Sequence, residues 1–275
     1  MTPIRAVTTV CLAIATLSSA LVASAHDFWL APAQSQMDVP SVVPVSVMIG
    51  HPRDRMRWPV NADRIIAFRS LGVDGVSDQQ SAVAAYAQGK TLPVHLQTTG
   101  LHILTIETTR ALSDLPAQQF EDYLTEEGLT LIQLDRVRRN VTDQSGTELY
   151  SRRGKTLLQV GPVTPADRDR LRRPAGLTLE IIAMDHPLEW VDGDDLQVKV
   201  LFRGAPLGGV TVGLVNTTDG TATAAHMKTM SDGTVSFAYP GPGSWMLHAV
   251  WGDRTDISDR ADYSTIFSSL SFVVL

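Results

Sequence analysis

This chain of 275 residues has one cysteine, Cys11, and it lies in an apolar N-terminal stretch. We predict that residues 1–25 are a secretory signal peptide, so the mature chain would contain neither a thiol nor a disulfide. Oxidising compartments permit disulfides without requiring them. The shortage of thiolates excludes zinc sites built on cysteine. Any metal site must therefore use nitrogen and oxygen donors, with at most a methionine thioether.

An excess of basic charge and a second long apolar run are also missing. The 23 Lys and Arg residues stand against 29 Asp and Glu residues, which gives a formal net charge of −6. A nucleic-acid-binding protein would show a basic face or stripe, so we expect no nucleic-acid partner. No segment after the signal peptide is apolar for the ~18 residues that a membrane helix needs. We expect no transmembrane segment in the mature chain.

Two common motifs of active sites are absent as well. No GxSxG nucleophile elbow is present, which argues against a Ser-His-Asp hydrolase. No two histidines stand four residues apart, as they would in a helical zinc site. The acidic segment Asp192-Gly193-Asp194-Asp195 lacks the spacing and the terminal glutamate of a helix–loop–helix calcium site, and we interpret it as a turn. These absences favour a protein that is not an enzyme.

His26 is the most informative residue that is present, because cleavage after Ala25 makes it the first residue of the mature protein. The segment Ala23-Ser24-Ala25 has the small residues of a cleavage site. An N-terminal histidine offers its α-amine and its imidazole to one metal ion, and imidazole suits copper, nickel and zinc. A cut after Ala20 would place His26 within a tail and remove this argument, and a histidine could also follow the cleavage site without any role.

Strand patterns dominate the mature chain and predict a mainly β fold with two β-sandwich domains. The polar, proline-flanked segment 164–174 separates residues 26–174 from residues 175–275. Short runs rich in β-branched residues predict strands of the first domain at 42–49, 64–70, 92–96, 101–108 and 155–160. Those of the second domain, at 177–183, 196–202, 210–215, 235–239, 245–251 and 266–275, alternate with glycine turns. This spacing resembles an Ig-like or transthyretin-like sandwich. The strand 101–108 alternates as a half-buried strand should.

A helical insertion near residues 115–140 interrupts the first domain. The first predicted helix, 116–127, places three apolar side chains on one face, with Asp114 as a possible cap and Gly128 as a stop: Phe120, Tyr123 and Leu124. The second, 131–139, offers Leu131, Leu134 and Val137. It ends in a basic cluster, Arg136, Arg138 and Arg139. These arginines could clamp an anion or a membrane partner, or form a solvated face paired with carboxylates.

Several motifs, in the same order, resemble one bacterial family. They are HDFWLAP at the mature start, Gly50-His51-Pro52, QFEDYLTEEGL, ELYSRRGKTLL, GAPLGGVTV and the segment from Trp245 to Ser264. This family of unknown function is exported and is described as periplasmic nickel- or cobalt-uptake components. The resemblance covers nearly all of residues 26–275. It implies a periplasmic metal-binding protein for nickel, cobalt or copper uptake or delivery, with a membrane metal transporter as a possible partner.

Matched residue by residue, the resemblance implies metal ligands at His26, His51 and His248. Asp27 could orient an imidazole or bind the metal itself. Alternation along 245–251 puts Met246, His248 and Val250 on one face. The alternative for His51 and His248 is an ordinary structural histidine, and we interpret His102 as structural. The remaining histidines lie near loops with no spacing that suggests a shared site: His95, His186 and His226. Binding should weaken as the pH falls through the histidine range.

Two other functions stay open at this point. The chain could be an exported interaction module that docks on a membrane transporter or receptor without binding metal. It could also be an oxidative enzyme, because an N-terminal histidine with a second histidine resembles the copper brace of polysaccharide-cleaving oxidases. Nothing else in the sequence resembles those enzymes.

Overall fold

The computed structural model describes residues 27–50, 54–58, 62–84, 91–218, 225–256 and 259–275. The predicted signal peptide, His26 and His51 lie outside the described residues. The mainly β fold is confirmed. The elements are β1 (Phe28–Pro32), β2 (Gln36–Met37), β3 (Ser41–Ile49), β4 (Met56–Arg57), η1 (Ala62–Arg64), β5 (Ile65–Gly72), β6 (Gly75–Asp78), α1 (Gln80–Ala84), β7 (Leu92–Leu96), β8 (Gly100–Thr108), β9 (Ala111–Leu115), α2 (Ala117–Glu126), α3 (Thr130–Arg139), β10 (Gly146–Val160), α4 (Pro165–Leu171), β11 (Leu179–Ala183), η2 (Pro187–Glu189), β12 (Asp195–Phe202), β13 (Ala205–Pro206), β14 (Thr211–Asn216), β15 (Ala225–Lys228), β16 (Thr234–Ala238), β17 (Gly243–Arg254) and β18 (Tyr263–Val274).

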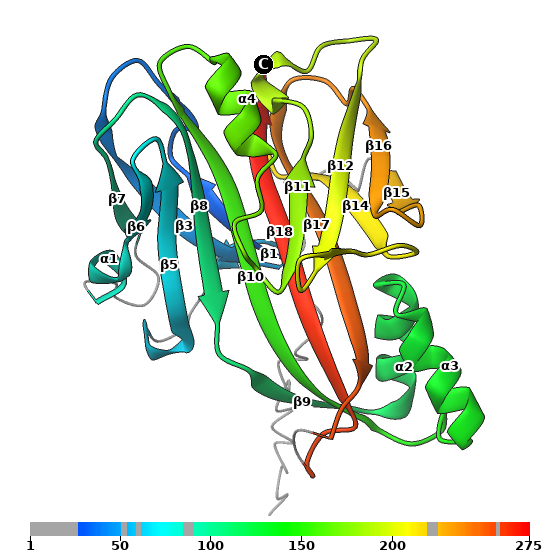
Figure 1. Ribbon diagram of the computed structural model, residues 1–275. Coiled ribbons are helices and arrows are strands. Elements are labelled where there is room, and N and C mark those ends of the chain that lie inside the picture. Colours follow the sequence, from blue (N-terminus) through cyan, green and yellow to red (C-terminus); the bar gives the residue numbers. More distant parts are fainter. Residues whose placement is uncertain (1–26, 51–53, 59–61, 85–90, 219–224, 257–258) are drawn as a thin grey trace, which may run out of the picture.

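One long sheet runs through both predicted domains. Within the described residues it has ten strands, in the order β15-β14-β17-β18-β10-β8-β5-β6, with β2 and β9 also paired to β10. Its centre is the parallel pair β10–β18, which aligns Glu148–Thr156 with Tyr263–Ser271. Figure 1 shows these two strands side by side in the middle of the molecule. The division at residue 174 stays a prediction, and the two regions share their largest sheet.

Two smaller sheets cover opposite faces of the long sheet. At one end, β1, β3, β4 and β7 pack on β5, β8 and β10 around a core that includes Val45, Leu92, Phe68, Leu104 and Leu158. At the other end, β11, β12, β13 and β16 pack on the opposite face, around a core that includes Val198, Phe237, Leu101, Leu247 and Leu270. Figure 1 shows β3 behind the long sheet and β12 in front of it.

Strand β8 is buried almost throughout, so the expectation of a half-buried strand is wrong. Eight of its nine residues are buried, and only Glu107 is partly exposed. The reason is its central position: Ile103 joins the core on one face of the long sheet and Leu104 the core on the other face. A strand covered on both faces needs apolar or satisfied side chains at every position.

Helix α2 packs on the long sheet through the three side chains that the sequence predicts. Phe120, Tyr123 and Leu124 are buried and share a core with residues of β17 and β18. The predicted cap is wrong, because the residue before the helix is Pro116 and no side chain caps it. Asp114 instead belongs to β9, where it pairs with β10.

Helix α3 packs on the core through a different face from the one that the sequence predicts. Ile132 and Arg136, four residues apart, are its buried residues. Because these two positions form the inner stripe, the predicted apolar stripe points outward: Leu131, Leu134 and Val137 are 55%, 53% and 64% exposed. A buried arginine replaces an apolar residue here, which pattern reading does not anticipate.

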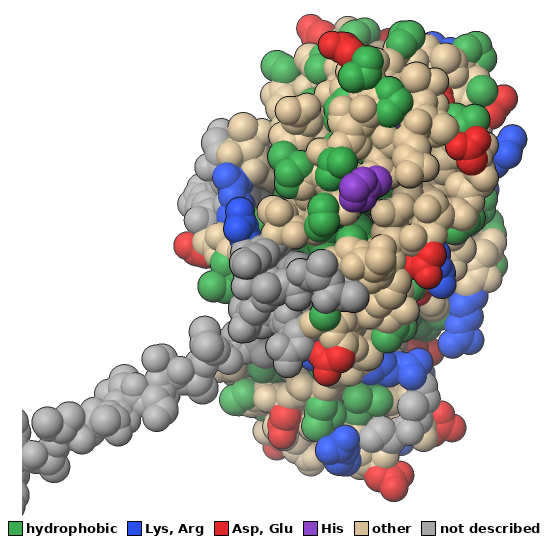
Figure 2. Space-filling model, turned by 90° about the vertical axis from the view of Figure 1, so that its left-hand side faces the viewer, with side chains coloured by type: hydrophobic (Ala, Val, Ile, Leu, Met, Phe, Trp, Pro, Cys, Tyr) green, Lys and Arg blue, Asp and Glu red, His purple; other side chains and the backbone are tan. Residues whose placement is uncertain are grey.

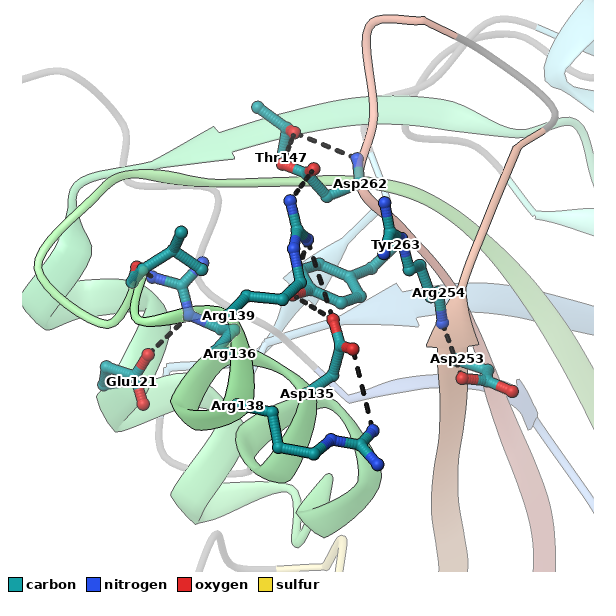
Figure 3. A network of polar contacts seen from close by, with 11 residues as sticks. Glu121, Asp135, Arg136, Arg138, Arg139, Thr147, Asp253, Arg254, Asp262 and Tyr263 are labelled. Carbon is teal, nitrogen blue, oxygen red and sulfur yellow. Dashed lines mark hydrogen bonds and ion pairs between the residues drawn. The ribbon is translucent and has the colours of Figure 1, made fainter.

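The predicted pairing of the α3 arginines with carboxylates is confirmed (Figure 3). Arg138 and Arg139 each lie 3.6 Å from a carboxylate oxygen of Asp135. Arg136 donates to Glu121 over 2.5 Å, but it is buried rather than solvated. The basic cluster therefore fixes the helix in place, and only Arg138 is well exposed.

Candidate metal centre

Two histidines and a glycine lie side by side on three neighbouring strands, and we call them the histidine row. The pairing of β15, β14 and β17 sets His226 opposite Gly213 and Gly213 opposite His248. The two imidazole centroids are 5.9 Å apart. A Cβ atom on Gly213 would lie 2.1 Å from Nε2 of His248 and 3.0 Å from Cδ2 of His226. Both rings therefore occupy the space that the missing side chain leaves open.

The start of β1 brings a carboxylate to this row. Oδ1 of Asp27 lies 3.3 Å from Nδ1 of His248, and the two side chains are 10% and 18% exposed. Strand β1 is held against the sheet, where Ser271 donates its hydroxyl hydrogen to the carbonyl of Leu30 over 2.6 Å. A carboxylate on the Nδ1 side of an imidazole favours the proton on that nitrogen and leaves the lone pair on Nε2. That nitrogen is the one beside Gly213.

The carboxyl of Glu127, at the end of α2, interacts electrostatically with Asp27. The pKa of the Glu127 carboxyl is raised well above its usual range, chiefly by burial and next by the negative charge of Asp27. The pKa of His226 is lowered, first by desolvation and then by His248, while Asp27 and Glu126 oppose the shift. An imidazole with a lowered pKa, next to carboxylates that repel one another, is an electrostatic setting in which a cation binds favourably.

A buried hydroxyl adjoins the row. Ser269 of β18 pairs with His248 of β17. Its Oγ is buried and has no hydrogen-bond partner among the described residues. Unpartnered buried polar atoms are uncommon. The Ser269 hydroxyl beside His248 can therefore still accept or donate a hydrogen bond that no described residue supplies.

Of the four predicted ligands, the structure brings Asp27 and His248 together. His26 and His51 lie outside the described residues. His26 directly precedes Asp27 in the sequence, and His51 directly follows Gly50. The backbone N–H of Gly50 donates to the carbonyl of Asp27 over 3.1 Å. The two remaining predicted ligands are thus chain neighbours of two residues that bond to each other beside His248.

Sequence reasoning missed His226. It belongs to β15, a strand of four residues without a clear apolar pattern. The first residue of this strand is partly exposed, and the other three, His226 among them, are exposed. The available signal was Gly213, a glycine between the apolar residues of a predicted strand. An isolated strand glycine marks close approach by other atoms. Here the atoms are the two imidazoles.

The other described histidines, His95, His102 and His186, lie outside the histidine row. The interpretation of His102 as structural is confirmed, since its Nε2 lies 2.8 Å from the carbonyl oxygen of Thr98. His186 is buried and its Nδ1 accepts from the N–H of Leu188. His95 is exposed on β7. Among the residues that the structure describes, no group of three or more His, Cys, Asp and Glu side chains forms a complete metal site.

The sequence matches one known protein family over most of its length. The model of the family named "Domain of unknown function (DUF4198)" matches residues 23–253. The chain belongs to this family. The match includes Asp27 and all three members of the histidine row. No curated protein matches the chain. Within the described part of this DUF4198 chain, no helix has the length and apolar character that crossing a bilayer requires.

Proposed function

We propose that this DUF4198 chain is an exported, periplasmic binding protein for a divalent transition metal, serving the uptake or delivery of nickel, cobalt or copper. The metal is its cargo, and the chain performs no catalysis. The observation that carries the proposal is the contact of Asp27 with His248, together with the position of His226 across Gly213. A structural histidine would need no glycine beside it and no second imidazole.

The donor chemistry supports the same proposal. Two imidazoles and a carboxylate are nitrogen and oxygen ligands of the kind that nickel, cobalt and copper accept. His26 and His51 adjoin the backbone pair formed by Asp27 and Gly50. With the signal removed after Ala25, His26 would add its imidazole and its α-amine. Asp27 would then orient His248 as a carboxylate partner of a ligand histidine does.

The first test is the mass of the exported protein followed by metal titration. Intact mass should correspond to a chain that begins at His26. Titration of the same sample with Ni²⁺, Co²⁺, Cu²⁺ and Zn²⁺ should give saturable binding at one site. His248→Ala and His26→Ala should each weaken binding on the order of tenfold, within the range for lost ligand or outer-shell groups. His95→Ala, at an exposed histidine on β7, is the matched control. Unchanged affinity in both test variants would rule the site out.

A second candidate function is docking on a membrane transporter or receptor. The observation that favours it is the exposed apolar stripe of α3, formed by Leu131, Leu134 and Val137. Exposed apolar stripes mark interaction surfaces when they are contiguous. A photo-crosslinking residue at position 134 should capture a membrane protein in intact cells, and one at position 95 should not. Capture combined with the absence of metal binding would favour docking as the whole function.

A further inference from the structure

Four arginines line one cavity on the other face of the long sheet, and we call it the arginine pocket. Its volume is about 320 Å³, and its arginines are Arg110, Arg153, Arg203 and Arg254. This volume falls within the ~300–1,000 Å³ of typical small-molecule sites. Trp251 and Ile266, which also line it, pack against the core on the side away from the histidine row. The pocket is therefore separate from the proposed metal centre.

The arginines are concentrated in a chain that is acidic as a whole. Two aspartates, Asp253 and Asp256, also line the pocket, so cationic side chains outnumber anionic ones there, against a formal charge of −6 for the chain. Asp253 already accepts from the backbone N–H of Arg254 over 2.7 Å. On the face shown in Figure 2, by contrast, Lys and Arg side chains are scattered among Asp and Glu.

Among the described residues, one of the four arginines is paired with a carboxylate. Within the described residues, Arg110, Arg203 and Arg254 form no ion pair. Arg153 is the exception, because its Nε lies 3.1 Å from a carboxylate oxygen of Glu107. Burial lowers the pKa of Arg153; the charge of Glu107 opposes this shift, and the charge of Arg110 adds to it. Like charges around one cavity repel one another, and an anion bound between them relieves that repulsion.

Arg203 is held in place by its turn and by an aromatic wall. Arg203 and Gly204 have φ of 51° and 79°, the two positive values of a hairpin turn that usually takes Asn-Gly. Its guanidinium lies 5.0 Å from the centroid of the Phe202 ring, and that ring stacks on Trp251 with centroids 4.0 Å apart. An arginine in this backbone conformation is uncommon. Stacking uses the flat face of the guanidinium and leaves the N–H donors at its edge available.

We propose that the arginine pocket binds a small organic polyanion, a molecule with two or more carboxylate or phosphate groups. The guanidinium fork matches both groups in a bidentate manner. Several forks around one cavity select for a ligand with several negative groups over a monovalent anion. The hydroxyls of Ser151, Thr178 and Ser264, which also line the cavity, add neutral polar contacts. This site is additional to metal binding and does not depend on it.

The test is calorimetric titration of the full-length mature protein with citrate, pyrophosphate and acetate at low ionic strength. The protein is first freed of metal on a chelating resin, since a soluble polycarboxylate chelator would compete for the pocket. We expect saturable binding of citrate or pyrophosphate and none of acetate. The tighter of the two ligands assigns the pocket to carboxylates or to phosphates. Equal binding of acetate, or no saturable binding of either polyanion at millimolar concentration, would overturn the proposal.

Variants locate the binding. The double substitution Arg110→Gln/Arg203→Gln should weaken binding of the polyanion by more than about tenfold, because it removes two charge-assisted sets of hydrogen bonds. Arg138→Gln, which removes the same charge from an arginine 75% exposed on α3, should bind as the wild type does. Circular dichroism verifies folding, and the single substitution Arg110→Gln provides an independent variant in case the double substitution fails to fold. Wild-type affinity in folded variants of the pocket would contradict the proposal.

Discussion

Two ion pairs on opposite faces of the long sheet differ in how completely they are satisfied. Nζ of Lys155 lies 2.9 Å from Oε1 of Glu180, and the two side chains are only 2% and 1% exposed. The same carboxylate accepts from three backbone N–H groups, those of Ala175, Gly176 and Leu177. A buried charge with this many partners has its desolvation offset, and it has no remaining capacity for a ligand.

The pair of Asp27 and His248 has the opposite character. It is longer, at 3.3 Å, and both partners keep some contact with solvent. No described backbone N–H donates to the Asp27 carboxylate, and one nitrogen of His248 lies next to Gly213 and faces His226. The comparison shows two kinds of polar pair in this fold: the first is fully satisfied, and the second keeps nitrogen and oxygen atoms available, as the proposed metal site requires.

Breaking the closed pair should have the largest effect. Lys155→Met leaves the Glu180 carboxylate buried without its cation, which costs about 3–5 kcal/mol. Urea unfolding should show this loss in the free energy of unfolding. Lys228→Met, at an exposed lysine of β15, is the control and should change stability little. A loss below about 1 kcal/mol for Lys155→Met would mean that the pair is not as closed as its geometry indicates.

Another buried carboxyl, that of Glu148, extends the comparison to the pH dependence of stability. Burial raises its pKa from the usual 4.5 to about 6, while hydrogen bonds from Thr265 and Tyr123 act the other way. The folded state thus holds a proton that the unfolded state releases, so stability is lost as the pH rises from 4.5 through 6. The shift corresponds to about 2 kcal/mol.

Glu148→Gln keeps a neutral side chain at every pH and should remove this loss. Relative to the wild type, the free energy of unfolding of the variant should rise by about 2 kcal/mol between pH 4.5 and pH 7. Urea unfolding of both proteins at several pH values measures the difference. Parallel pH curves would show that Glu148 does not titrate in this interval.

Disturbing the open pair should affect binding more than stability. In Gly213→Ala, the new methyl group would occupy the space of the two imidazoles, because its Cβ lies 2.1 Å from Nε2 of His248. These side chains are near the surface and can move aside, so stability should change by less than about 1 kcal/mol. Metal affinity should fall on the order of tenfold, as expected when a ligand is displaced.

The matched control for Gly213→Ala is Gly72→Ala. Its Cβ would lie 2.8 Å from Nδ1 of His102, a histidine outside the proposed centre. Titration of both variants with Ni²⁺ should separate them. Equal affinity of the two variants would place the metal elsewhere.

The most exposed pair should matter least. Arg138 is 75% exposed and lies 3.6 Å from Asp135. Arg138→Gln should change the free energy of unfolding by less than about 0.5 kcal/mol, because solvent screens such pairs. Urea unfolding of the variant and of the wild type measures this difference in the free energy of unfolding. A loss above about 1 kcal/mol would show that exposure alone does not rank these pairs.

Local sequence patterns predicted the positions of helices and strands well, but they predicted less well which of their faces are buried. Strand β7 has the predicted bounds, 92–96, and β17 alternates as expected, with Leu247 in one core and Met246 in another. The buried face of α3 could not be read from its own residues, because Arg136 finds its partners on α2 and in the following loop. Propensity and periodicity describe a segment, whereas its neighbours are set by tertiary structure.

The candidate site shows the same limit. His248 was predicted from a resemblance and Asp27 from its place beside His26, and their contact depends on how β1 lies across the sheet. His226 was missed because pairing between β14 and β15 sets its position, and no spacing within the sequence encodes that pairing. The arginine pocket likewise draws on residues from β10, from the turn after β12 and from the end of β17. Such clusters become visible only when the strand order is known.

The parallel pairing of β10 with β18 has a consequence for the order of events during folding. The paired residues are 115 positions apart in the chain, and β18 follows every other strand. As the chain emerges from its N-terminal end, the facing edges of β10 and β17 have no neighbour until β18 arrives. Unpaired edges invite association with other chains. The long sheet can therefore be completed only after β18 has been made, and these edges stay open until then.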